Sequence, residues 1–169
     1  MIMSETSKQH KKEASHDIIC GIITLSDSRK SEKLDLSGQY LAEEIESRYT
    51  LKSRNLIPDE KDELIKSIEA MIADEIDVII TNGGTGLDSR DITVETVESL
   101  FDKKLDGFGE IFRSISYNEI GAAALLSRAT AGIYKKTLIF SMPGSPNAVK
   151  TALGIIIDEL PHIVHHVKK

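Results

Sequence analysis

The sequence predicts an α/β protein: a three-layer α/β/α sandwich with a mainly parallel sheet. Short apolar segments alternate along the chain with longer segments of helical periodicity, which is typical of successive β-α units. The apolar segments are hydrophobic at nearly every position, as expected for strands buried on both faces. One of them runs directly into a glycine-rich loop and then a helix, which is how such sheets form binding loops at the carboxyl ends of their strands.

The predicted strands are short and each ends in a polar or glycine-containing loop. They cover residues 18–25, 51–57, 77–81 and 137–141. The first and third are almost entirely apolar, whereas the second is weaker because it contains Lys52, Arg54 and Asn55. These features predict that the first and third strands are buried, as in a parallel sheet whose two faces are both covered.

Helices are predicted wherever apolar residues recur at three- and four-residue spacing. They cover residues 36–49, 59–72, 93–101, 108–115, 122–126 and 148–160, and the last ends at Pro161. Asp59 and Thr93 stand at predicted N-cap positions, where a short polar side chain satisfies free backbone N–H groups. Residues 162–169 are expected to form a solvated tail.

Length and composition limit the possible classes of protein. A chain of 169 residues predicts one domain, which we assign to residues 17–169, with a disordered polar tail over residues 1–16. With 21 basic and 27 acidic residues, the net charge of −6 argues against a nucleic-acid partner.

Three further absences point to a cytoplasmic protein. Cys20 is the only cysteine, so no internal disulfide can form. No apolar stretch approaches the ~20 residues that a membrane span requires, so no membrane partner is expected. The start of the sequence lacks the apolar segment of a secretory signal.

Four loops are expected to meet at one edge of the sheet. They are residues 26–28, 58–59, 83–91 and 143–146, and each follows a predicted strand. Right-handed crossovers between parallel strands place such loops at the same edge. The sequence therefore predicts one site built from all four loops.

The glycine-rich loop suits a phosphate group. Gly83, Gly84 and Gly86 free the backbone, and backbone N–H groups without side chains can surround an anion. Neither common phosphate motif matches: no lysine follows Gly86 as in a P-loop, and Ser89 replaces the third glycine of the dinucleotide pattern. A tight turn that binds nothing remains the alternative.

The four loops carry carboxylates and hydroxyls but neither histidine nor cysteine. These side chains are Ser26, Asp27, Ser28, Asp59, Thr85, Asp91 and Ser145. Their composition argues against a histidine-assisted nucleophile and suits Mg²⁺ with phosphate groups.

Each candidate also has a purely structural interpretation. Asp59, Asp91 and Ser145 could serve only as helix caps, and Asp27 only as an Asx-turn residue. Arg90 and Arg128 are candidate phosphate partners, although surface arginines are common. His162, His165 and His166 could form a metal cluster, or could simply lie in the solvated tail.

Taken in order, the loops resemble a family of molybdenum cofactor biosynthesis proteins that includes MoaB and MogA. The motifs lie in residues 81–86, 90–93 and 142–146, with further matches at 26–28, 37–38 and 58–59. The resemblance covers residues 17–161, and residues 107–113 and 127–129 are most similar to the MoaB branch.

The resemblance implies a molybdopterin-binding fold and Mg²⁺-dependent adenylylation of molybdopterin by ATP. Asp59 and Asp91 match the two functional aspartates of the family, with catalytic and metal-binding roles. The implied ligand-binding residues are Ser26, Asp27, Ser28, Gly83, Gly84, Thr85, Gly86, Gly144 and Ser145. In this scheme residues 83–86 bind phosphates, Ser145 contacts the pterin side, and the loop of Asp27 lines the same cleft.

The same resemblance leaves alternatives open. Asp88 and Ser89 depart from the family pattern, and the additional carboxylate could repel a nucleotide or join a metal site. Some members of the MoaB branch lack catalytic acids, so a non-catalytic molybdopterin carrier is one alternative and an interaction module is another. The family implies a homotrimer or homohexamer, for which residues 108–120 are a candidate contact, and other cofactor-biosynthesis enzymes as possible partners.

Overall fold

The computed structural model describes residues 17–28, 31 and 34–169. The predicted tail over residues 1–16 lies outside this range. In the part of the chain that is described, no helix is long and apolar enough to cross a membrane.

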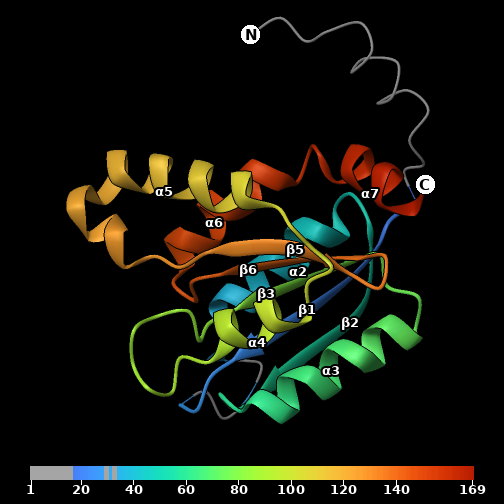
Figure 1. Cartoon of the computed structure of the whole chain (residues 1–169), viewed down its shortest axis with the longest axis horizontal. Helices are drawn as coiled ribbons and strands as arrows, with labels where there is room; N and C mark the ends of the chain where they lie inside the picture. Colours follow the sequence, from blue (N-terminus) through green and yellow to red (C-terminus); the bar gives the residue numbers. More distant parts are fainter. Residues whose placement is uncertain (1–16, 29–30, 32–33) are drawn as a thin grey trace, which may run out of the picture.

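A six-stranded sheet forms the centre of the described structure, with the strand order β2-β1-β3-β6-β5-β4 (Figure 1). The strands are β1 (Ile19–Leu25), β2 (Thr50–Ile57), β3 (Val78–Asn82), β4 (Lys103–Lys104), β5 (Thr130–Tyr134) and β6 (Thr137–Met142). Strand β1 pairs in parallel with both β2 and β3, and β3 pairs in parallel with β6. Strand β5 is antiparallel to both β6 and β4.

Helices cover both faces of the sheet. They are α2 (Leu36–Glu46), α3 (Lys61–Ala73), α4 (Thr93–Leu100), α5 (Asp106–Ile120), α6 (Pro146–Ile156) and α7 (Leu160–Lys168), with the 3-10 helix η2 (Gly121–Leu126) after α5. Helices α3 and α4 pack on one face, and α2, α5, α6 and α7 pack on the other (Figure 1). The predicted three-layer sandwich is therefore confirmed.

Alternating side chains of the central strands build two cores. Ile23, Ile79 and Ile139 belong to the core under α3 and α4. Their chain neighbours point to the opposite face, because successive strand residues alternate, and there Phe140 meets Phe108 of α5 edge to face at 5.0 Å. The apolar runs in the sequence thus reflect burial on both faces, as predicted.

The C-terminal segment differs from the prediction. The expected single helix over residues 148–160 is two helices, α6 and α7, and residues 160–168 are helical rather than a tail. Pro161 lies in the first turn of α7, where proline starts a helix instead of ending one. Lys168 near the end of α7 forms an ion pair with the buried Asp77.

Two strands escaped the prediction, and one predicted helix has a different form. Strand β5 contains Ala131 and Gly132, which are weak strand formers, and it pairs with β6 through a turn at Lys135 and Lys136 with positive φ. A Cβ on Gly132 would lie 2.4 Å from the ring of Phe101, so only glycine fits there. The helix predicted over residues 122–126 is the 3-10 helix η2.

Replacing Ile139 by alanine should destabilise the protein strongly. Ile139 is fully buried in β6, so the lost packing and the cavity should lower the free energy of unfolding by about 2–5 kcal/mol, measured by urea denaturation. The control is Leu36→Ala, because Leu36 is 66% exposed and its loss should change stability by less than about 0.5 kcal/mol. Equal losses in the two variants would contradict the assigned core.

Candidate functional site

The register of the parallel strands brings the predicted loops together. Thr24 of β1 pairs with Asn82 of β3, which pairs with Met142 of β6. On the other side of β1, Leu25 is level with Ile57 of β2. All four loops therefore begin at the same edge of the sheet, as the sequence predicts.

The glycine loop adopts a backbone conformation that side chains would prevent. Gly83 and Gly84 have φ values of 96° and 64°, in the left-handed region that favours glycine. A Cβ on Gly83 would lie 2.3 Å from the carbonyl oxygen of Leu25, and one on Gly84 would lie 2.9 Å from Asp59 Oδ1. Thr93 holds the loop by donating from Oγ1 to the Gly83 carbonyl and from its N–H to the Gly84 carbonyl, both at 2.9 Å.

Asp27 and Asp59 hold each other by reciprocal hydrogen bonds. The N–H of Asp27 donates to Asp59 Oδ2 at 2.9 Å, and the N–H of Asp59 donates to Asp27 Oδ1 at 3.0 Å. Arg90 donates to both carboxylate oxygens of Asp27, at 2.9 and 3.1 Å, and to Glu60 at 2.9 Å. These bonds from Arg90 and Asp59 lower the pKa of Asp27. Asp27 is therefore more than an Asx-turn residue, and Arg90 already has two carboxylate partners.

Asp59 carries the most unusual carboxyl group of the site. Its Oδ1 is buried and has no hydrogen-bond partner among the residues that the structure describes. Burial raises the pKa of Asp59, and the negative charges of Asp27 and Asp91 raise it further. The helix-cap interpretation is wrong, because Glu60 is the N-cap residue of α3 and no side chain caps that helix.

Asp91 stabilises the turn that contains Asp88 and Ser89, the two residues that depart from the family pattern. The N–H of Asp88 donates to Asp91 Oδ2, and the N–H of Asp91 donates to the Asp88 carbonyl, both at 2.9 Å. Asp88 Oδ1 in turn accepts the N–H of Arg90 at 3.0 Å, so the additional carboxylate closes this turn. Asp91 does not cap α4, whose N-cap residue is Ile92; Thr93, predicted as N-cap, is the first residue of the helix.

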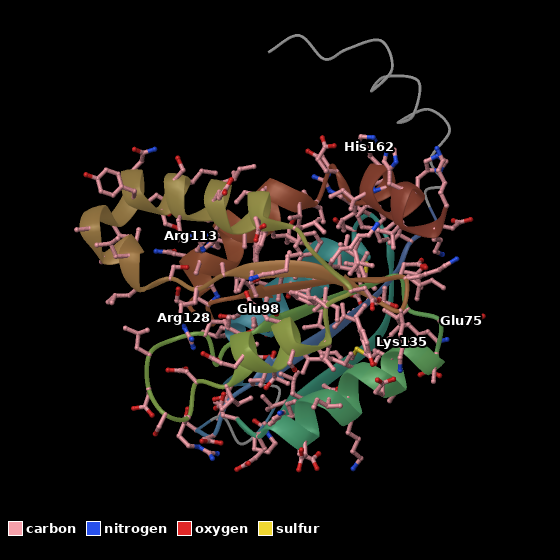
Figure 2. All side chains as sticks on the ribbon, viewed as in Figure 1. Glu75, Glu98, Arg113, Arg128, Lys135 and His162 are labelled. Carbon is pink, nitrogen blue, oxygen red and sulfur yellow. The ribbon has the colours of Figure 1, made fainter. Side chains whose placement is uncertain are left out.

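Arg128 holds the glycine loop through hydrogen bonds to backbone carbonyl groups, a role that the sequence did not reveal. Its Nε donates to the Thr85 carbonyl at 3.1 Å and its Nη2 to the Asp91 carbonyl at 3.3 Å, while Glu95 pairs with its charge. Figure 2 shows Arg128 beside the loop that precedes α4. Because it binds two backbone carbonyls, Arg128 positions the loop between Thr85 and Asp91.

The loop of Gly144 and Ser145 closes the other side of the site. Ser145 caps α6 by accepting the N–H of Ala148 at 3.3 Å, and it lies in the lining of the cleft as well. A Cβ on Gly144 would lie 3.1 Å from the Cα of Gly83, which shows how closely the two loops approach. Ser37 Oγ donates to the Gly144 carbonyl at 2.7 Å.

A cleft of about 440 Å³ lies between these loops, and α5 and η2 form a wall that combines apolar with polar side chains: Phe112, Ile120 and Leu126 beside Ser116 and Glu119. Of the predicted site residues, it is lined by Gly84, Thr85, Gly86, Asp91, Gly144 and Ser145. Gly83, Asp59 and the loop over residues 26–28 adjoin it without lining it. Ser26, Asp27 and Ser28 do not line this cleft, since the bonds between Asp27 and Asp59 hold their loop against the loop after β2, and their part in ligand binding stays a prediction.

The C-terminal histidines do not form a metal cluster. Nε2 of His162 and Nε2 of His166 are 3.1 Å apart on α7. Figure 2 shows His162 on this helix. Over residues 17–28, 31 and 34–169, no group of three or more histidine, cysteine, aspartate or glutamate side chains is arranged to hold a metal ion.

Comparison with known proteins agrees with this geometry. Residues 21–162 match the family model described as a probable molybdopterin binding domain, so the fold and site define a molybdopterin-binding domain. The chain is 45% identical over 166 residues to molybdenum cofactor biosynthesis protein B of Bacillus subtilis, covering 96% of this chain and 97% of that protein. It is 44% identical over 167 residues to the molybdopterin adenylyltransferase of Pyrococcus furiosus, covering 96% and 98%.

Solved structures lead to the same family. The tungsten cofactor synthesizing protein MoaB from Pyrococcus furiosus superposes with a TM-score of 0.87 at 43% identity, and the match covers 92% of this chain and 100% of that one. A MogA structure superposes with a TM-score of 0.80 at 27% identity, covering 88% and 99%. The chain belongs to the MoaB/MogA family of molybdenum cofactor biosynthesis proteins, which confirms the resemblance inferred from the motifs.

Removing the charge of Asp59 should stabilise the protein. Because its folded-state pKa is raised, the ionised carboxylate is penalised in the folded protein once the pH exceeds the ordinary aspartate value. Asp59→Asn should raise the melting temperature at pH 7 by roughly 1–3 °C, and the difference should vanish below about pH 3.5. The measurement is thermal unfolding across pH in EDTA.

Asp27→Asn provides the opposite control for this experiment. The pKa of Asp27 is lowered, so its ionised form stabilises the fold above the ordinary value and this contribution is lost as the pH falls through the lowered pKa. The variant should therefore melt below the wild type at neutral pH. A destabilised Asp59→Asn protein would contradict the account of that carboxyl group.

Proposed function

We propose that this protein is a molybdopterin adenylyltransferase in molybdenum or tungsten cofactor biosynthesis, with ATP and molybdopterin as substrates. The observation that carries the proposal is the pair Asp59 and Asp91, which flank a glycine loop that can bind phosphates beside a 440 Å³ cleft. Relatives that share 43–44% identity over most of their length are named molybdopterin adenylyltransferase or probable molybdopterin adenylyltransferase.

We assign Mg²⁺ to the carboxylates of Asp59 and Asp91. Mg²⁺ takes oxygen ligands and is usually held by one or two carboxylates together with substrate phosphates, so a full set of protein ligands is not needed. The buried Oδ1 of Asp59 has no described partner and faces Gly84, which fits a ligand atom directed at a phosphate-bound cation. The ion would neutralise charge on the phosphates.

The chain's own residues bind and align the two substrates. The backbone of Gly84, Thr85 and Gly86 favours the phosphates of ATP. The loop of Ser145 and the wall formed by α5 would receive the pterin side. An oxygen of the terminal phosphate of molybdopterin then attacks the α-phosphorus of ATP, and the bond to the β-phosphate oxygen breaks to release pyrophosphate.

We further propose that residues 17–169 form one domain and that the protein works in the cytoplasm. The family match over residues 21–162 leaves no room for a second domain of ordinary size within this range. A buried, unpaired Cys20 and the use of ATP both fit a reducing compartment inside the cell.

Replacing Asp91 by asparagine should abolish turnover while the fold is kept. Asparagine still accepts the hydrogen bond from the Asp88 N–H but removes the charge, so kcat should fall by about 10²–10³-fold. The measurement is formation of adenylyl-molybdopterin from ATP and molybdopterin, with and without Mg²⁺. Asp88→Asn is the matched control, because asparagine also closes the turn and should leave kcat within about threefold.

The outcomes of this assay separate the two candidate functions. Product that depends on Mg²⁺ and is lost in Asp91→Asn supports the enzyme. Molybdopterin binding without consumption of ATP would instead identify a carrier protein, with both aspartates reduced to structural roles. Full activity in Asp91→Asn would remove Asp91 from the catalytic assignment.

We also propose that the protein forms a homotrimer or homohexamer through α5 and η2. Large apolar side chains are exposed along these elements, which marks an interaction surface. They are Ile111, Ile115, Tyr117, Ile120, Leu125 and Leu126.

A charge placed on this surface should dissociate the oligomer. Leu125 is 84% exposed, so Leu125→Glu should be tolerated by the fold and should reduce the mass measured by sedimentation velocity at micromolar concentration. Leu36→Glu on α2 is the control and should leave the mass unchanged. A wild-type protein that sediments as a monomer would contradict the proposed assembly.

A further inference from the structure

A chain of buried polar side chains runs beneath the cleft, outside the residues assigned to binding and catalysis. Thr24 and Asn82 are fully buried and Asp35 is 1% exposed. Thr24 Oγ1 donates to Asp35 Oδ2 at 2.6 Å, and Asn82 Nδ2 donates to Thr24 Oγ1 at 2.9 Å. Since Asn82 ends β3 and directly precedes Gly83, the chain leads to the start of the glycine loop.

Asp35 connects this hydrogen-bonded series of side chains to two further elements, α2 and β2. It is the N-cap residue of α2 and accepts the N–H of Gly38 at 2.9 Å. Arg54 of β2 donates to Asp35 Oδ2 at 3.3 Å and so compensates the buried charge. A Cβ on Gly38 would lie 1.9 Å from Asp35 Oδ2 and 2.7 Å from Thr24 Oγ1, so the packing here admits only glycine.

The contacts of Asp35 fix the direction of the hydrogen bonds in this network of side chains. The hydroxyl of Thr24 donates to Asp35 Oδ2, so its proton points to Asp35. The hydroxyl oxygen can then accept only from the amide nitrogen of Asn82, since a reversed amide would bring two acceptors together. Asn82 Oδ1 remains buried without a partner among the described residues. A network that tolerates an unsatisfied buried acceptor points to a functional constraint.

The start of α2 also reaches the opposite wall of the cleft. Ser37 is fully buried, and its Oγ donates to the Gly144 carbonyl at 2.7 Å. The N–H of Gly83 donates to the Met142 carbonyl at 3.1 Å, which ties the glycine loop to the strand that leads to Gly144. One short segment, residues 35–37, is therefore connected to both loops that form the cleft.

We propose that Thr24, Asp35 and Asn82 form a positioning relay for adenylyl transfer. The relay sets the separation between the glycine loop and the loop of Gly144, and thereby aligns the phosphate of molybdopterin with the α-phosphorus of ATP. This inference rests on the proposed function. Alignment of the reacting atoms determines the rate of the chemical step, whereas each substrate is bound through many contacts. Disturbing the relay should therefore reduce kcat more than it raises KM.

The test replaces Thr24 by valine, which keeps the shape of the side chain and removes its hydroxyl. Thr24→Val should lower kcat at least ~10-fold and change both KM values by less than ~3-fold, and Thr24→Ser should restore kcat to within ~3-fold of the wild type. Thr137→Val is the matched control: Thr137 is a buried threonine at the opposite end of the sheet, where its Oγ1 bonds the Ile76 carbonyl at 3.1 Å. The Thr137→Val variant should be less stable than the wild type but should keep its kcat.

A second readout does not depend on activity. The backbone amide resonances of Gly84 and Gly144 in NMR spectra should shift in Thr24→Val and stay in place in Thr137→Val. Absence of product from the wild-type protein would refute the proposed function, while these resonances would still decide whether the relay controls the loops.

Specific results would overturn the relay. It is wrong if Thr24→Val retains kcat, if Thr24→Ser fails to restore it, or if Thr137→Val loses as much. Should Thr24→Val fail to fold, Ser37→Ala cuts the branch to Gly144 and should produce the same selective loss of kcat and a shifted Gly144 resonance. Unchanged kcat and an unchanged resonance in Ser37→Ala would then refute the proposal.

Discussion

Thr24, Asn82 and Met142 lie level with one another across three parallel strands, and this register determines where the cleft can form. Loops that leave a sheet at one level can share backbone hydrogen bonds, as the N–H of Gly83 does with the carbonyl of Met142. A slip of one residue in any of these strands would turn its side chains to the other face. The two buried cores therefore hold the site in place as well as the fold.

The arrangement of charged groups in the site lowers the stability of the folded protein. Asp27 is compensated by Arg90, but Asp59 has a raised pKa and a buried oxygen that no described residue bonds, close to two other carboxylates. A protein selected for stability alone would gain by neutralising Asp59. That it keeps this carboxylate next to Gly84 is understandable if a cation and phosphates complete the site, because each then offsets the charge of the other.

The sequence allowed prediction of those features that depend on local patterns. Apolar runs identified four strands, and the polar residues, glycines and prolines that follow them located the loops that converge. Features that depend on distant partners were not predictable. For Asp59 the sequence leaves a helix cap open beside the functional role that the resemblance implies, and it does not reveal the hydrogen bonds with Asp27, 32 positions earlier. Likewise, β5 becomes a strand through pairing with β6, and Arg128 gains its role from carbonyl groups of a loop about 40 residues away.

The last strand of the sheet has a consequence for how copies of the protein can meet. Strand β4 is two residues long and consists of two exposed lysines, Lys103 and Lys104. Such an edge resists pairing with a strand of another molecule, because the ladder is too short and like charges would face each other. Self-association by extending the sheet, which is also the first step of many aggregation pathways, is disfavoured at this edge. At this end of the sheet, contacts between copies are left to the helical faces, where side chains rather than backbone groups decide which surfaces fit.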